Sequence, residues 1–70
     1  MYIVVELQKN GDQLSNIVTS HATRNDADSK FYQVMAAAAV SNVEKHACTI
    51  ITEEGASLRS GYYEHKQEGS

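Results

Sequence analysis

Two side chains that can do chemistry, His46 and Cys48, stand two residues apart in a run that alternates as a strand does. On a strand this spacing puts both on one face, where His21 or His65 could join them. A zinc site usually takes four such ligands at a recognisable spacing, and a thiol nucleophile needs a base and an oxyanion donor. The sequence supplies neither set. We therefore expect a structural thiol and surface imidazoles, with no enzyme activity, no metal and no cofactor, and keep a metal- or thiol-dependent enzyme as a distant alternative.

A second group of candidate residues joins aromatic and polar side chains near the end of the chain. Tyr63 and His65 share one face of the strand expected there, and Tyr62 and Glu64 share the other. Aromatic side chains on a sheet can stack on bases or anchor a protein partner. The net charge of −3 and the absence of a basic block argue against partners held by bulk electrostatics, such as nucleic acid or a membrane surface. Because the aromatic residues could still stack on bases, a small protein that binds single-stranded nucleic acid is kept as the alternative function and not as the leading one.

A helix expected from Thr23 to Asn42 has to position these residues. Thr23 followed by Asp26 has the form of a capping box and predicts the helix start. Apolar residues recur at helical spacing and should face the sheet. They are Ala27, Phe31, Val34, Met35 and Ala38. The last two turns are rich in alanine, which either reflects a good helix former or marks a contact with another helix.

A hairpin is expected before the helix, with strands over residues 2–8 and 13–22. Asn10 and Gly11 are the strongest short-range hairpin signal because both tolerate positive φ. As a two-residue turn they would pair Leu7 with Leu14. The second strand is rich in Ser, Asn and Thr, which suits a sheet edge.

Both faces of this hairpin carry apolar side chains. We expect the face with Ile3, Val5 and Leu7 to be the core. The opposite face then presents Tyr2, Val4 and Ile17, which would lie in water in a monomer with one covered sheet face.

A second hairpin is expected after the helix, with strands over residues 43–52 and 57–65. A three-residue loop with Gly55 in the left-handed region is the sterically easier turn. It pairs Ile50 with Leu58, Cys48 with Ser60 and His46 with Tyr62. A two-residue turn instead pairs Ile51 with Leu58, Ala47 with Tyr62 and Lys45 with Glu64, and its opposite-charge pair favours it. In both registers Leu58 and Tyr62 share a face.

Together these elements predict one α+β domain over residues 1–65, of order ββαββ, with a four-stranded antiparallel sheet and the helix packed on one face. Residues 66–70 are polar and should form a flexible C-terminal tail. A chain of 70 residues buries only about 60% of its unfolded surface, so association with a second copy is a natural way to gain stability. The leading function is a non-enzymatic homo-oligomeric module that binds protein.

One helix can cover one sheet face, so the other face is the expected homodimer interface. Sheet-on-sheet packing is the preferred geometry, and the helix side around Ala36 and Val40 is the alternative. The expected interface residues are Tyr2, Val4, Ile17, Ile51 and Tyr63.

Cellular context follows from the cysteine count and from hydropathy. Cys48 is the only cysteine, so no intrachain disulfide can form, and neither a signal peptide nor a membrane-spanning run is expected. These features favour a cytoplasmic protein.

Three stretches of the chain resemble small uncharacterised proteins of bacterial phages and mobile elements. They are residues 1–6, residues 31–35 with the alanines that follow, and residues 63–65. That resemblance covers nearly the whole chain and implies no activity.

Overall fold

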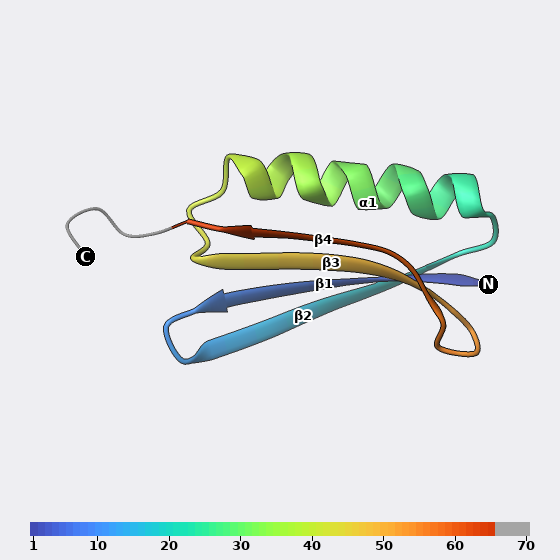
Figure 1. Ribbon diagram of the computed structural model, residues 1–70, viewed down its shortest axis with the longest axis horizontal. Helices are drawn as coiled ribbons and strands as arrows, with labels where there is room; N and C mark the ends of the chain where they lie inside the picture. The colour runs from blue at the N-terminus through green and yellow to red at the C-terminus, as the bar shows by residue number, and fades with distance from the viewer. Residues whose placement is uncertain (66–70) are drawn as a thin grey trace.

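The computed structural model describes residues 1–65 and confirms the predicted ββαββ order and α+β class. Four antiparallel strands form one sheet in the order β2-β1-β3-β4, and the helix packs along one face of it (Figure 1). The predicted tail, 66–70, lies outside the described residues. The elements are β1 (Tyr2–Asn10), β2 (Gln13–His21), α1 (Arg24–Ala39), β3 (Lys45–Thr52) and β4 (Ser57–Glu64).

The start of α1 agrees with the capping signal in the sequence. Thr23 is extended, with φ −123° and ψ 156°, and its side chain accepts a hydrogen bond from the Asp26 N–H at 3.2 Å. The helix ends at Ala39, before the predicted end at Asn42. Val40 leaves the helical region, and its N–H donates to the carbonyls of the preceding turn, which closes the helix there.

The first hairpin turns on Gly11 and Asp12 instead of Asn10 and Gly11. Gly11 has φ +59°, while no residue other than glycine has positive φ in the described chain. A positive φ at the first central residue alone is typical of a type II′ turn, whereas Asn-Gly as the loop would need positive φ at both positions. Leu7 therefore lies opposite Asn16 and not Leu14. Because the register moves by two residues along the pair, each side chain keeps its expected face. The polar strand β2 lies at the sheet edge, as predicted.

The second hairpin combines features of both expected registers. The Gly55 N–H donates to the Thr52 carbonyl, and Gly55 has φ +89°, so the loop has the expected left-handed glycine. A β-bulge at Leu58 then shifts the pairing by one residue. Beyond the bulge the pairs are those of the alternative register, including Lys45 with Glu64. The bulge also turns Leu58 toward the core, so it does not share a face with Tyr62 as predicted.

The helix covers the sheet face that the sequence analysis assigned to the outside. Val4 is only 1% exposed and packs in the core with Phe31 and Ile50. The face with Ile3, Val5 and Leu7, expected to be the core, points away from α1. The prediction failed because both faces of β1 are apolar, so alternation alone could not choose between them.

Gly61 provides a physical reason for this choice of face. It lies on the helix side of β4, opposite Cys48. A Cβ at Gly61 would come within 2.8 Å of Met35 Cε and 3.1 Å of Phe31 Cζ. The helix can therefore approach closely on this side. On the opposite side the neighbouring Tyr62 stands up from the sheet.

Candidate interaction surface

A buried polar cluster lies beneath the helix, where the structure places the candidate His46 and Cys48. His46 Nε2 is 2.6 Å from Glu6 Oε2, and Gln8 Nε2 donates to the same carboxylate oxygen at 2.8 Å. His46 Nδ1 is buried and has no hydrogen-bond partner. Glu6 was not among the predicted site residues. It reaches His46 because β1 pairs with β3, a neighbour relation that hairpin patterns do not reveal.

The chemistry of this cluster is set by burial. Burial under α1, followed by the Glu6 carboxylate, raises the pKa of the Cys48 thiol to about 11, and Lys30 opposes the shift. The thiol is therefore protonated at neutral pH, and a protonated thiol is a poor nucleophile. Within residues 1–65 no three His, Cys, Asp or Glu side chains gather as a metal site would require. The arrangement is that of a hydrogen-bonded polar pair inside a core.

The second candidate group is split between the two sheet faces. Tyr63 lies on the helix side and stacks on His65, with ring centroids 6.1 Å apart and an interplanar angle of 4°. His65 Nε2 donates to the Ala38 carbonyl at 2.7 Å and so satisfies an acceptor in the last turn of α1. Tyr62 points to the opposite face, beside Ala47. The tyrosines therefore do not form one stacking platform.

The predicted interface residues do not form one surface. Val4 belongs to the core, and Tyr2 packs against it from the helix side. Ile17 also lies on the helix side, but on the edge strand β2, where it is 49% exposed. Tyr63 is on that side as well. Ile51 alone among the five lies on the face away from α1, opposite Ile3.

The face away from α1, called here the open sheet face, consists of four rows of side chains across β2, β1, β3 and β4. No element of residues 1–65 covers it, and its largest apolar side chains are exposed, Leu7 by 37% and Tyr62 by 56%. Row 1 is Ser20, Ile3, Ile51 and Ser57; row 2 is Val18, Val5, Thr49 and Ser60; row 3 is Asn16, Leu7, Ala47 and Tyr62; row 4 is Leu14, Lys9, Lys45 and Glu64.

Within these four rows, charge is confined to one end. Rows 1 to 3 hold no charged side chain, whereas row 4 holds Lys9, Lys45 and Glu64. Lys9 lies opposite Lys45, whose Nζ is 3.9 Å from Glu64 Oε2. The face therefore has an uncharged area over three rows and a charged border at the hairpin tip.

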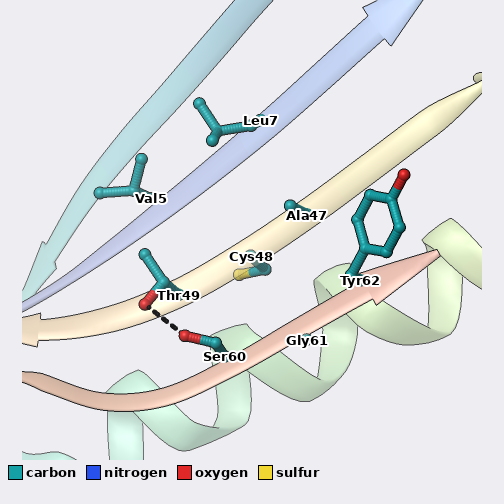
Figure 2. A pocket seen from close by; sticks show the side chains of 8 residues that line it. All are labelled: Val5, Leu7, Ala47, Cys48, Thr49, Ser60, Gly61 and Tyr62. Atoms are coloured by element: carbon teal, nitrogen blue, oxygen red, sulfur yellow. Dashed lines mark hydrogen bonds between the residues drawn. The ribbon is translucent and has the colours of Figure 1, made fainter.

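A hollow of about 390 Å³ lies in the uncharged area between β1 and β4 (Figure 2). Ala47 forms its floor because its side chain is short, while Leu7 and Tyr62 stand on either side. Thr49 Oγ1 and Ser60 Oγ, 3.0 Å apart, line the end nearer row 2. The hollow is mostly apolar and wide open, so it can receive a large side chain from a second surface.

Comparison with protein-family models, curated proteins and solved structures finds no match to this chain. The resemblance to phage and mobile-element proteins therefore stays a prediction. The helix in residues 1–65 lacks the length and apolarity needed to cross a membrane.

Proposed function

We propose that this protein is a non-enzymatic, homo-oligomeric interaction module in which the open sheet face of one copy packs on the same face of another. The observation that carries the proposal is the uncharged area of rows 1 to 3, which no element of residues 1–65 covers. A sheet needs cover for an apolar face, and sheet-on-sheet packing supplies it. An isologous pair of identical faces is the commonest symmetric solution.

The size of the uncharged area sets the expected affinity. Four strands spaced ~4.8 Å and three rows spaced ~6.8 Å give roughly 400 Å² per copy, or about 800 Å² for two. This is below the standard size of a stable interface, about 1,200 to 2,000 Å². If two thirds of it is apolar, burial contributes ~13 kcal/mol before association costs of about 4 to 15 kcal/mol. We therefore expect micromolar association through this face.

Row 4 determines the orientation of the pair. A two-fold axis parallel to the strands would stack row 4 on its own copy and bring Lys9 and Lys45 against the same residues of the partner. A two-fold axis across the strands at row 2 packs row 1 of each copy on row 3 of the other. Row 4 then lies at the rim of the pair, facing the end of the sheet that carries Met1 and Glu53. Because lysines at a rim cost little and lysines buried without partners cost much, the second orientation is favoured.

Substitutions at exposed apolar positions test which surface associates. Leu7→Lys places a charge in the uncharged area and should give a folded protein of lower mass by sedimentation equilibrium. Val40→Lys is the matched control, because Val40 is 85% exposed at the end of α1. It should leave the mass unchanged. Loss of association in Val40→Lys with none in Leu7→Lys would move the interface to the helix side.

Cross-linking tests the orientation. Val5 in row 2 lies near the proposed axis, so Val5→Cys should be joined to its symmetry mate by a short bis-maleimide. Lys9→Cys, in row 4, should not be joined. Cys48 is buried and protonated near neutral pH, so it does not compete for the reagent. Efficient cross-linking through position 9 alone would contradict this orientation.

A further inference from the structure

The edge strand β2 has none of the features that usually protect a sheet edge from pairing. Edges are commonly blunted by charged side chains, proline or a bulge. The other edge, β4, carries Arg59, Glu64 and a bulge at Leu58. Strand β2 runs for nine residues, Gln13–His21, without a register shift. Among the four strands of residues 1–65 it is the one with no Asp, Glu, Lys or Arg.

The turn geometry shows which backbone groups of β2 face outward. In a hairpin with a two-residue turn, the residues that flank the turn form a hydrogen-bonded pair, here Asn10 and Gln13. Pairing then alternates, so Glu6 with Ile17 is also a hydrogen-bonded pair. The residues between them direct their N–H and C=O groups away from β1. These outward residues are Leu14, Asn16, Val18 and Ser20, and they flank Ile17 symmetrically.

Ile17 marks the centre of this edge. It is the middle residue of β2, and 49% of it is exposed although it lies on the helix side of the sheet. In Figure 1, β2 is the strand farthest from α1, which accounts for the exposure of Ile17. This exposed isoleucine at the centre of an uncharged edge is available to contact a neighbour across that edge.

We propose that β2 pairs antiparallel with β2 of a second copy about a two-fold axis through Ile17. The two Ile17 side chains then form a close non-hydrogen-bonded pair, and Asn16 and Val18 exchange backbone hydrogen bonds with Val18 and Asn16 of the other copy. A two-fold axis brings the same strand against itself, so charges near its centre would repel their own copies. The uncharged sequence of β2 avoids this repulsion.

This edge pairing is independent of the open sheet face, and the two surfaces can be used together. The axis through Ile17 is perpendicular to the sheet, whereas the axis of the face-to-face pair lies between two sheets at row 2, which contains the adjacent Val18. Perpendicular two-fold axes generate a closed tetramer when they cross, so two eight-stranded sheets packed face to face form here once the face-to-face axis shifts by one residue, ~3.4 Å, to the level of Ile17. That tetramer rests on the proposed function as well as on the edge.

Sedimentation equilibrium of four proteins tests the edge separately from the face. The native chain should reach four times its mass of 7.7 kDa. Ile17→Lys places like charges against each other at the axis and should stop at a dimer, while the matched control Ile17→Thr stays a tetramer. Leu7→Lys should also stop at a dimer, and Leu7→Lys with Ile17→Lys should be a monomer. Circular dichroism checks that each variant is folded.

A backbone variant complements Ile17→Lys, which remains the decisive variant because Asn16 also lies in row 3 of the open sheet face. Asn16→Pro removes one outward N–H, which an edge strand tolerates, and should also yield a dimer. A native dimer that Ile17→Lys leaves intact would overturn the edge pairing and keep the proposed function. A native dimer that Ile17→Lys dissociates and Leu7→Lys does not would keep the edge pairing and overturn the proposed function. A native monomer would overturn both.

Discussion

Gly61→Ala should weaken the contact between α1 and β4. The new Cβ would lie 2.8 Å from Met35 Cε, 3.0 Å from Met35 Sδ and 3.1 Å from Phe31 Cζ. The thioether of Met35 is flexible and can move aside, but the Phe31 ring is buried in the core. Overpacking of this kind costs about 1 to 3 kcal/mol, and we expect the lower half of that range because part of the clash falls on Met35.

A double-mutant cycle identifies the source of that cost. Met35→Ala removes both atoms on the Met35 side of the clash, so Gly61→Ala should cost about 1 kcal/mol less in the Met35→Ala background than in the native chain. The assay is urea unfolding followed by circular dichroism, at one fixed protein concentration because association adds to stability. Ser60→Ala, which changes the neighbouring residue on the open sheet face, is the control.

Two results of the cycle would refute the close approach of the helix at Gly61. The first is a neutral or stabilising Gly61→Ala, since alanine restricts the unfolded chain and helps wherever there is room. The second is strict additivity with Met35→Ala.

Four further predictions concern the core, the helix cap and the buried thiol. Phe31→Ala should cost ~3 to 5 kcal/mol by urea unfolding, enough to unfold most of a domain this small, because the ring is buried at the centre of the core. Thr23→Ala should cost about 1 kcal/mol, since the Asp26 N–H loses its acceptor, and Thr23→Ser should restore it. The Cys48 thiol should react slowly with iodoacetamide at pH 8 in the folded protein and readily in urea, and rapid labelling of the native state would contradict its burial. The pKa of this thiol is about 11 in the folded protein and 9.0 for an exposed cysteine, so the unfolded chain ionises first. Stability should therefore fall as pH rises from 9 to 11, a slope that Cys48→Ala should reduce.

Local signals in the sequence were sufficient for the elements and their order. Thr23 capped the helix as predicted, and the uncharged, polar strand β2 lay at the edge. Turn chemistry placed both hairpins, although the left-handed residue Gly11 occupied the first central position of its turn instead of the second. The turn type and the position of the bulge at Leu58 are set by local backbone geometry. Composition does not determine either of them to the exact residue.

The choice of the covered face could not be predicted from alternation. Val4 and Val5 are equally suited to a core, and a strand with two apolar faces fits either orientation. Which face of the sheet α1 covers depends on which strands lie next to each other in space. Gly61 leaves room for α1 on one side of β4, and Glu6 meets His46 on that same side only because β1 and β3 are adjacent. Both relations join residues that are far apart in the chain.

A dilution series followed by methyl NMR tests most directly whether the open sheet face is where copies associate. The methyl signals of Val5 and Leu7, in rows 2 and 3, should shift as the protein is diluted through the micromolar range. Those of Val34, in the core, and Val40, at the exposed end of α1, should stay in place. Shifts at Val40 with none at Val5 and Leu7 would contradict the proposed interface. A monomer whose spectrum does not change with concentration would contradict it as well.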